Sequence, residues 1–591
     1  MLFRIVCEYY LRLEQTTKRL EMIAIMAELL KKIMEDLGAE GIEKIVYLTQ
    51  GKLYPDWTGK PEIGIAEKMA ASAVARALGV GVNRVLALVH EEGDIGSACE
   101  KLLSKKRQKP LLETPLTLIS VYDSLVKIAA TQGTGSTDLK IRSLAGLLTV
   151  ATPIEARYLL RTITSNLRLG IADMSVLDAL AEAFAGGKEN RPSIERAYNL
   201  TSDLGYIARI LAIDGLAGIE KITVTLGKPI RMMAAQKLST PAEIIEKLEG
   251  QCFAEWKIDG ERMQIHKRKK DVTIFSRRLE QITEAYPDIV SLVQRHLKAE
   301  NCIVEGECVA IDTSEPNKML PFQVLMRRRR KYGIEEMVEE IPAALFLFDC
   351  LYIDGEDLTQ LPYTARRSRL EEIVKSGDRF NLVPAFPTPT AKAIDKIFRE
   401  AIEKGCEGII AKSSGSNSIY RAGGRSWLWV KLKESYQAQA IGPVDLVVVG
   451  ALWGRGRRAK MYGSLLAAVL DEETERLKTV CKVGTGFSDE ELEQLQSRFK
   501  PYVLPSMDPL VDSKIEANVW FKPALVFQVF GDEITRSPIH TCAYDIITPN
   551  EGLAIRFPRF DGTWRPDKSW REATTVNQII TLYKEQTRVQ T

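Results

Sequence analysis

Length, composition and charge set the first limits on what this chain can be. It has 591 residues, too many for one hydrophobic core, which predicts about three or four domains. Hydrophobic residues make up 45% and charged residues 27%, as in an ordinary globular protein. The 81 basic and 78 acidic residues nearly cancel, which excludes binding of nucleic acid through bulk positive charge. A phosphate-binding surface would need local basic clusters, such as residues 327–331 and 455–460, unless these runs are solvated helix faces or loops.

The first residues and the cysteines indicate the compartment. Residues 1–19 mix apolar with charged residues, so we expect a helix and not a signal peptide. No apolar run of about 18 residues occurs, so no membrane span is expected. The nine cysteines are scattered singly, and only four histidines are present, which argues against zinc fingers and disulfide frameworks. We therefore expect a cytoplasmic protein with reduced thiols.

Helical spacing dominates the chain up to about residue 226. Apolar residues recur every three or four positions, as in 20–30 and 176–184, which predicts one all-helical domain over 1–226. Residues 133–136, Gly-Thr-Gly-Ser, could present amides to a phosphate or form a plain interhelical turn. Arg161, Asn166, Arg168 and Gly170 fit a DNA-facing surface, and equally a solvated helix end.

The pattern changes at Gly227-Lys228-Pro229 and again near residue 433. β-Runs and helices alternate between these points, which predicts a mixed α+β domain over 227–433. Short β-runs then predict a small barrel over 434–591, with a helix starting after Ser488 and a last helix at 576–585. The expected strands are 252–256, 263–266, 271–275, 302–311, 344–352, 408–411, 427–432, 441–451, 464–470, 479–483 and 519–529, and the expected helices of the second domain are 364–375 and 391–404.

The segment 255–262, Glu-Trp-Lys-Ile-Asp-Gly-Glu-Arg, lies between two of these β-runs. A lysine becomes a good nucleophile when burial or nearby cations lower the pKa of its amine. Asp259-Gly260 predicts a turn that places a carboxylate beside Lys257. The alternative is a hairpin whose Lys257, Asp259 and Arg262 merely face solvent.

Further motifs follow this lysine in a fixed order. Alternation over 429–433 predicts that Lys431 and Lys433 share one face of a strand, where their ammonium groups would neutralise a polyphosphate. The other motifs are Ser276-Arg277-Arg278, Val304-Glu305-Gly306-Glu307, Phe346-Leu347-Phe348-Asp349 and the run 407–412, Glu-Gly-Ile-Ile-Ala-Lys.

In this order the motifs resemble those of the covalent nucleotidyltransferases, which comprise DNA ligases, RNA ligases and mRNA capping enzymes. Over the whole chain the resemblance is to the ATP-dependent DNA ligases of archaeal and eukaryotic type. Further matching segments are 93–96, 167–181, 445–458, 484–488 and 556–568. The resemblance implies a monomer with an all-α N-terminal DNA-binding domain, an α+β adenylation domain and a C-terminal OB-fold β-barrel.

The same resemblance implies roles for the residues around the lysine. Lys257 would attack the α-phosphate of ATP and hold AMP as a phosphoramidate, while Asp259 orients or deprotonates it. Glu255 would read adenine, Glu307 would bind a ribose hydroxyl, and Phe348 would stack on the base, with core packing as the alternative for Phe348.

A second group of residues is implied to bind the metal and the phosphates. Glu407, with Glu307, would hold Mg²⁺ or Mn²⁺, and a surface salt bridge is the alternative for Glu407. Residues 434–438 would be the hinge that lets the barrel close over the site as a lid. The phosphate-binding residues would be Arg262, Arg277, Arg425, Lys431, Lys433, Arg565 and Lys568.

The implied substrate is nicked duplex DNA, sealed in replication, repair and recombination, with ATP and possible use of ADP or GTP. Residues 108–112, Gln-Lys-Pro-Leu-Leu, lack the aromatics of a sliding-clamp motif and contain a proline, which counts against clamp contact. No zinc site is expected in the barrel, which argues against the NAD-dependent type. An RNA ligase or capping enzyme would share the lysine motifs, but the large helical region favours a DNA clamp. A nucleic-acid-binding scaffold with an inactive transferase fold predicts a damaged core motif, and none is found.

Overall fold

The structure is a computed structural model that describes residues 1–105, 115–165, 167–312, 318–329, 333–433, 441–454 and 461–588. It forms two compact units, one of Met1–Val89 with Asp94–Leu432 and one of Lys433–Thr591 with His90–Gly93. Asn166 and the segments 108–112, 434–438 and 455–460 lie outside the described residues. No single helix in the described part is long and apolar enough to cross a membrane, although one sharply bent pair, Glu67–Leu78 with Val82–Glu92, meets the length and composition criteria jointly.

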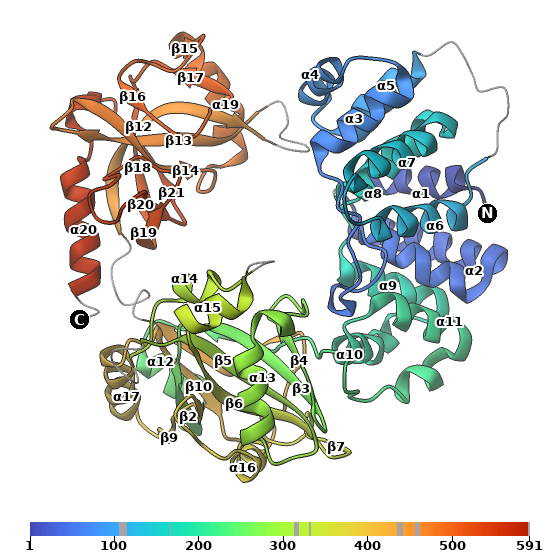
Figure 1. Ribbon diagram of the computed structural model, residues 1–591, viewed down its shortest axis with the longest axis vertical. Coiled ribbons are helices and arrows are strands. Elements are labelled where there is room, and N and C mark those ends of the chain that lie inside the picture. Colours follow the sequence, from blue (N-terminus) through green and yellow to red (C-terminus); the bar gives the residue numbers. More distant parts are fainter. Residues whose placement is uncertain are drawn as a thin grey trace. The chain divides into compact units, whose positions relative to one another are not determined.

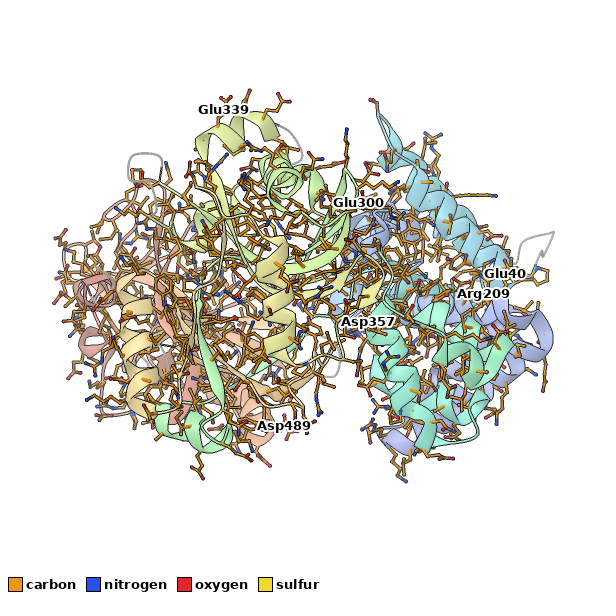
Figure 2. The ribbon with its side chains drawn as sticks, turned by 90° about the horizontal axis from the view of Figure 1, so that it is seen from below. Glu40, Arg209, Glu300, Glu339, Asp357 and Asp489 are labelled. Atoms are coloured by element: carbon orange, nitrogen blue, oxygen red, sulfur yellow. The ribbon has the colours of Figure 1, made fainter. Side chains whose placement is uncertain are left out.

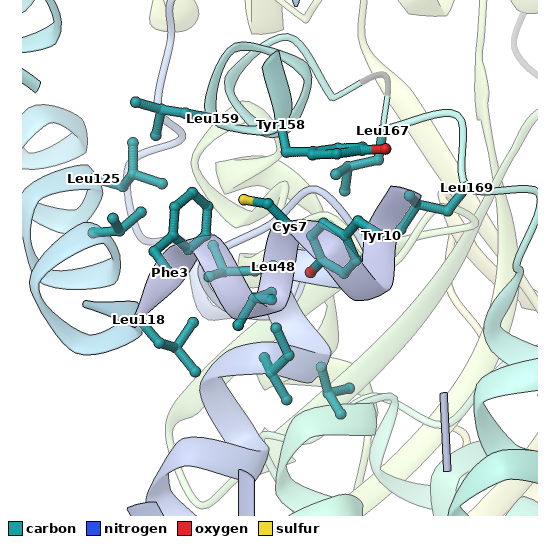
Figure 3. Packing of buried hydrophobic residues seen from close by; sticks show 14 of the residues in the cluster. Phe3, Cys7, Tyr10, Leu48, Leu118, Leu125, Tyr158, Leu159, Leu167 and Leu169 are labelled. Atoms are coloured by element: carbon teal, nitrogen blue, oxygen red, sulfur yellow. The ribbon is translucent and has the colours of Figure 1, made fainter. Parts of the chain in front are cut away.

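The first region is all-helical, as predicted, and packs around one large hydrophobic core (Figure 1). Figure 3 shows part of this core, in which side chains from distant segments, such as Phe3, Leu118 and Tyr158, gather around Cys7. Residues 133–135 form a turn before the seventh helix, which begins at Ser136, so an interhelical turn is present; phosphate binding at this turn stays a prediction. The helices are α1 (Phe3–Gln15), α2 (Arg19–Thr49), α3 (Glu67–Leu78), α4 (Val82–Glu92), α5 (Ile95–Ser104), α6 (Leu118–Ala130), α7 (Ser136–Val150), α8 (Pro153–Ile163), α9 (Asp173–Phe184), α10 (Arg191–Thr201) and α11 (Leu204–Glu220).

Arg161 belongs to a buried ion network and not to a surface. Its guanidinium donates to Asp94 at 2.9 and 3.0 Å and to Glu14 at 2.8 Å, and the side chain is 3% exposed. Arg168 adds a further contact to Asp94 at 3.1 Å. Both expectations for Arg161, a DNA-facing surface and a solvated helix end, are therefore wrong, because the side chain is buried and pairs with the buried carboxylate of Asp94 and the partly buried carboxylate of Glu14.

Charged residues with exposed ends lie elsewhere on the helical region. Figure 2 labels Glu40 of α2 and Arg209 of α11 at its surface. Arg209 lies 3.5 Å from Glu43 with half of its side chain exposed, so this contact is a weak surface pair.

The second region combines two β-sheets with helices on their outer faces, as the predicted α+β class requires (Figure 1). One sheet has the strand order β1-β11-β10-β2-β9, and the other has the order β4-β3-β5-β6-β7, with β8 paired to β6. The strands are β1 (Ala234–Lys237), β2 (Cys252–Lys257), β3 (Glu261–Arg268), β4 (Asp271–Ser276), β5 (Asn301–Ala310), β6 (Ala343–Ile353), β7 (Glu356–Asp357), β8 (Phe380–Leu382), β9 (Ala385–Pro387), β10 (Gly408–Ser413) and β11 (Arg425–Lys433). The helices are α12 (Pro241–Lys247), α13 (Pro287–His296), α14 (Phe322–Met326), α15 (Ile334–Glu340), α16 (Tyr363–Ile373) and α17 (Ala391–Glu403).

The segment 258–260 carries the chain from one sheet to the other. Strand β2 pairs with β9 and β10, whereas β3 pairs with β4 and β5. Gly260 fits this crossing because a Cβ there would lie 2.3 Å from the carbonyl oxygen of Cys308. The hairpin alternative for this segment is therefore wrong, and Lys257 ends a strand at the junction of two sheets.

Buried ion pairs join the helices of this region to its sheets. Arg366 of α16 is fully buried and donates to both carboxylate oxygens of Asp349 on β6, at 2.8 and 3.0 Å. Burial alone would raise the pKa of Asp349, but the charge of Arg366 and its hydrogen bonds hold it below the ordinary value. The described part of the basic run 327–331 is also ion-paired, since Arg327 contacts Glu340 and Arg328 is fully buried against Asp288. Arg328 is therefore structural, and the prediction of a phosphate-binding residue is wrong for it, whereas Arg327 is half exposed and forms a surface pair.

Strand β3 also fixes the segment that leaves the helical region. Gln264 accepts from the amide of Ile230 at 2.7 Å and donates to its carbonyl at 3.0 Å. Nδ1 of the buried His266 accepts from the amide of Gly227 at 3.0 Å. Residues 227–230 are therefore held by buried side chains of the second region.

The third region is a β-barrel with two packed helices, as predicted (Figure 1). Ser488 caps α19 with a capping box to Glu491, also as predicted. The expected strand 519–529 is two strands, because Pro523, which has no N–H to donate to a ladder, lies between them. The elements are β12 (Ile441–Trp453), β13 (Tyr462–Asp471), β14 (Arg476–Val483), α19 (Asp489–Phe499), β15 (Val503–Leu504), β16 (Val511–Asp512), β17 (Val519–Phe521), β18 (Val526–Gly531), β19 (Glu533–Ser537), β20 (Gly552–Arg556), β21 (Arg559–Trp564) and α20 (Val576–Arg588).

Replacing Arg366 with methionine leaves the carboxylate of Asp349 buried without its main counter-charge. We expect a loss of about 3–5 kcal/mol in the free energy of unfolding, measured by urea titration with tryptophan fluorescence. The control is Arg369→Met on the same helix, whose pairs with Glu356 and Glu372 are exposed and should be dispensable. Equal unfolding midpoints for the two variants would contradict the prediction that the buried pair of Arg366 and Asp349 is needed for stability.

His266 makes stability depend on pH. Burial, then the charge of Arg268, lowers its pKa to about 3, below the unfolded value of about 6.5. A folded pKa below the unfolded one means that stability is complete above about pH 6.5 and falls as the pH drops toward 3. Between about pH 7.5 and 5 the folded state should lose about 2 kcal/mol through this group. Urea midpoints at both pH values measure this, and His266→Asn, which keeps an acceptor for Gly227, should show a smaller difference.

Candidate active site

Three carboxylates surround Lys257 where β2 ends. The Lys257 ammonium lies 2.5 Å from a carboxylate oxygen of Glu407, and the Glu407 amide donates to the Lys257 carbonyl at 2.8 Å. Asp259 shares a hydrogen bond with Glu407, and Glu307 interacts electrostatically with both carboxylates and with Lys257. Pairing of β2 with β10 brings Lys257 beside Gly408, which places Glu407 at the lysine. The structure therefore brings together four predicted site residues.

Two of these carboxylates are easily protonated. Burial, followed by the hydrogen bond and charge of Glu407, raises the pKa of Asp259 to about 6, against an opposing effect of Lys257. Burial raises the pKa of Glu307 to about 7, although Lys257 and Arg262 oppose it. A group with a pKa near neutrality suits proton transfer, and Asp259 is adjacent to the amine.

Arg262 and Arg277, both predicted phosphate ligands, line one basic cavity of about 780 Å³. Arg262 donates to Glu305 at 2.8 Å and to the carbonyl of Met233 at 2.7 Å. Its guanidinium lies 5.3 Å from the ring centroid of Phe348. Four further cations line the cavity, Lys52, Arg168, Arg231 and Arg278, so an anion would be attracted there.

Lys412 contacts both Glu255 and Phe348, the predicted base-binding residues. Glu255 is 2% exposed, and its carboxylate contacts the Lys412 ammonium at 2.7 Å. The same ammonium lies 4.8 Å from the ring centroid of Phe348 and donates to its carbonyl at 3.1 Å. Phe348 is only partly buried, so part of its surface remains available to a ligand.

The remaining predicted residues lie on β11 and in the barrel. Lys431 and Lys433 alternate with buried Val430 and Leu432, as expected for one face of the strand, and Arg425 is exposed at its start. In the second unit, Asp445 of β12 binds both Lys568, at 2.6 Å, and Arg565, at 3.2 and 3.3 Å.

Sequence reasoning assigned no role to Lys412, Glu305 or Tyr363. Lys412 and Glu305 are charged residues inside otherwise apolar strand runs, and such residues are buried only when paired. That signal was available in the sequence. The hydroxyl of Tyr363 donates to Glu255 at 2.5 Å across distant segments, and no local pattern indicates this.

Comparison with known proteins finds DNA ligases that match the chain over nearly its full length. Three family models match the chain: DNA ligase N terminus over residues 2–181, ATP dependent DNA ligase domain over 232–433, and ATP dependent DNA ligase C terminal region over 458–568. DNA ligase 2 of Thermofilum pendens is 48% identical over 592 residues, covering 99% of this chain and 97% of the relative. DNA ligase of Hyperthermus butylicus is 45% identical, covering 100% and 98%. A solved structure, Pmar-Lig_PreS3, shares the fold with a TM-score of 0.56 at 18% identity, covering 95% of this chain and 99% of that one.

Lys257 lies among carboxylates, and Arg262, five residues further along, lines a basic cavity and lies beside the partly buried Phe348, an arrangement that suits an enzyme acting on phosphates. The chain belongs to the family of ATP-dependent DNA ligases, which seal nicks in DNA. The DNA ligase relatives match from end to end, so the RNA ligase and capping alternatives are not supported.

The pKa of Asp259 predicts how the transfer of AMP to the enzyme depends on pH. If its carboxylate accepts the lysine proton, the rate should fall as the pH drops through about 6, because the protonated form cannot act as a base. Single-turnover labelling with ATP between about pH 5 and 8 measures the profile. Asp259→Asn should lower the rate about 10²–10⁴-fold and abolish this acid limb. Asp271→Asn, at the exposed start of β4, is the control, and an acid limb retained in Asp259→Asn would contradict the assignment.

Proposed function

We propose that Lys257 is the residue that carries AMP. The carboxylates around it accept the proton of its ammonium group and bind the metal. The ion pair between Lys257 and Glu407 supports this most directly, because it holds an amine at a strand end among acidic groups. Asp259, with its raised pKa, accepts the lysine proton. The lone pair of Lys257 then attacks the α-phosphorus of ATP, a P–N bond forms, and the P–O bond to pyrophosphate breaks.

The carboxylates also fit a divalent metal. The described residues contain no group of three or more His, Cys, Asp or Glu side chains arranged to hold an ion unaided. Mg²⁺ and Mn²⁺ take oxygen ligands, and Mg²⁺ usually binds one or two carboxylates together with phosphate oxygens, so Glu407 with Glu307 is a suitable set. When bound, the metal would neutralise charge that develops on the phosphates.

The nucleotide and the DNA would be held by the flanking residues. Glu255 recognises the base, Phe348 stacks on it, and Glu307 also binds a ribose hydroxyl. The cations of β11, Arg425, Lys431 and Lys433, bind the triphosphate, and Arg565 and Lys568 of the barrel take the pyrophosphate.

The 5′-phosphate at a nick then takes AMP from the lysine, and the 3′-hydroxyl displaces AMP to seal the strand. The basic cavity that contains Arg262 and Arg277 holds the phosphates of the nick. The helical region binds the duplex backbone without reading its sequence. We infer a monomer that acts in replication, repair and recombination, and no contact with a sliding clamp is proposed.

Lys257→Ala should abolish covalent labelling, because it removes the amine that we propose as the nucleophile. Incubation with α-labelled ATP and Mg²⁺, followed by denaturing electrophoresis, should give a labelled band for wild type and none for Lys257→Ala. Lys392→Ala, at an exposed position of α17, is the control and should label like wild type.

Label that persists in Lys257→Ala would overturn the assignment. Wild type that fails to label is treated first with pyrophosphate, which removes AMP already bound. If ATP, ADP and GTP then all fail, the inactive-scaffold interpretation is correct. Assays of nick sealing on DNA-only and RNA-containing duplexes show which polynucleotide the enzyme joins.

A further inference from the structure

Asp445 of β12 contacts two cations of the barrel at once. The Lys568 ammonium donates to its Oδ2 at 2.6 Å, and Nη1 of Arg565 donates to Oδ2 and Oδ1 at 3.2 and 3.3 Å. The other nitrogens of the Arg565 fork, Nε and Nη2, donate to Asp567 at 2.9 and 2.6 Å. We call these four side chains the barrel ion cluster. Its positive and negative formal charges cancel, so the cluster as a whole attracts an anion only weakly.

The carboxylate of Asp445 is fixed, whereas that of Asp567 is exposed. The Asp445 side chain is 12% exposed, and that of Asp567 is 60% exposed. The Asp445 amide donates to the Thr574 hydroxyl at 3.0 Å, and the Asp445 carbonyl accepts from the Thr574 amide at 2.9 Å. Pairing of β12 with β18 also places Asp445 opposite Gln528 in the ladder. Asp445 therefore stays in place when an anion approaches the cluster, while Asp567 can turn into solvent.

The two cations keep part of their surface and part of their hydrogen-bonding capacity for a ligand. The side chains of Arg565 and Lys568 are 22% and 29% exposed. A guanidinium and an ammonium each carry more N–H donors than the contacts above use. The Arg565 amide donates to the carbonyl of Val526 at 2.8 Å, and the Lys568 amide donates to the carbonyl of Arg565 at 3.2 Å. A phosphate can thus contact both cations while the turn that carries them stays in place.

The fixed carboxylate acts on such a phosphate in two opposite ways. Its hydrogen bonds hold Arg565 and Lys568 on the same group, which orients both cations. Its negative charge lies close to any phosphate oxygen that binds these cations, and like charges repel where access of water is restricted. The repulsion decides the affinity, because backbone hydrogen bonds already fix the turn that carries both cations. The affinity of the two cations for a phosphate is therefore lower than it would be without the charge of Asp445.

We propose that Asp445 is a positioning residue that holds Arg565 and Lys568 in place and lowers their affinity for pyrophosphate, so that this product leaves once AMP is on the enzyme. The inference rests on the proposed binding of pyrophosphate by these two cations, through which Asp445 acts. Tight binding of the product would favour the reverse reaction, in which pyrophosphate attacks the phosphorus of the lysine adenylate. That attack breaks the P–N bond, forms a P–O bond and returns ATP, and the amine of Lys257 takes up a proton.

The reverse reaction measures this affinity directly. Full-length enzyme is labelled with α-labelled ATP and Mg²⁺, freed of nucleotide, and mixed with Mg²⁺ and increasing pyrophosphate. The rate at which the label leaves the protein gives the KM for pyrophosphate. Asp445→Asn keeps the size of the side chain and one acceptor oxygen but removes the charge, so it should lower this KM about three- to tenfold. A purely structural role predicts the opposite direction, because damage to a binding site raises the KM.

Asp471→Asn is the matched control. Asp471 ends β13 and its side chain is 14% exposed, much like that of Asp445. Its carboxylate contacts Lys478 at 3.3 Å and the Thr474 hydroxyl at 2.7 Å, which are not members of the barrel ion cluster. This variant should keep the KM of wild type. A KM for pyrophosphate that is unchanged or higher in Asp445→Asn would overturn the proposal, as would an equal fall of the KM in Asp471→Asn.

Two further variants separate failure of this inference from failure of the proposed function. Asp445→Ser is a second uncharged variant with the same expected fall in KM, and it decides the question if Asp445→Asn does not fold. Lys568→Met should raise the KM, because it removes one of the two proposed ligands. If Lys568→Met leaves the KM unchanged, the proposed role of the barrel cations is wrong and the inference is wrong with it. If Lys568→Met raises the KM and neither Asp445 variant lowers it, only the inference about Asp445 is wrong.

Discussion

The pairing of β2 with β10 is the constraint on which the site depends. Lys257 ends β2 and Glu407 immediately precedes β10, so the register of these two strands decides whether their charges meet. The crossing at Gly260 then turns the chain into the second sheet, where Arg262 and Glu307 are opposite each other in the ladder of β3 and β5. These two ladders thus bring Lys257 together with Glu407 and Glu307 from segments far apart in the chain.

The transferase region accepts an unusual density of buried charge around this register. Arg366 with Asp349 and Lys412 with Glu255 each place an ion pair in surroundings that exclude water, and Arg262, which lines the basic cavity, pairs with the fully buried Glu305. Such pairs contribute little net stability compared with apolar residues of the same size, because desolvation opposes their attraction. Their presence makes physical sense where charges must keep fixed positions, as around a polyphosphate. At these pairs the packing contributes less to stability than apolar residues would, and the positions of the charges are fixed.

The sequence indicates local structure here better than it indicates partners. The alternation over 429–433 correctly predicts which face carries Lys431 and Lys433, and the capping serine correctly starts α19. The motif around Lys257 predicts a functional lysine but not the change of sheet after it, because strand pairing is decided by residues far away. Arg161 and Arg328 appear as surface cations in the sequence, yet each is buried against carboxylates that only the folded chain brings near. A run of charged residues in the sequence shows only the composition of that segment. Whether a charged side chain is buried depends on the groups that pack against it in the folded chain.

The attachment of β3 to residues 227–233 has a consequence for where this protein can be divided. Gln264, His266 and Arg262 satisfy the backbone of Ile230, Gly227 and Met233, and these bonds are buried or partly buried. A fragment that began after Met233 would remove these backbone partners of Gln264, His266 and Arg262 and would expose the face of β3 that the segment covers. Ile230 and Met233 are themselves fully buried, so the short connecting segment belongs to the core of this region. A self-contained catalytic module therefore has to carry it along, as must any transplant of this domain between enzymes.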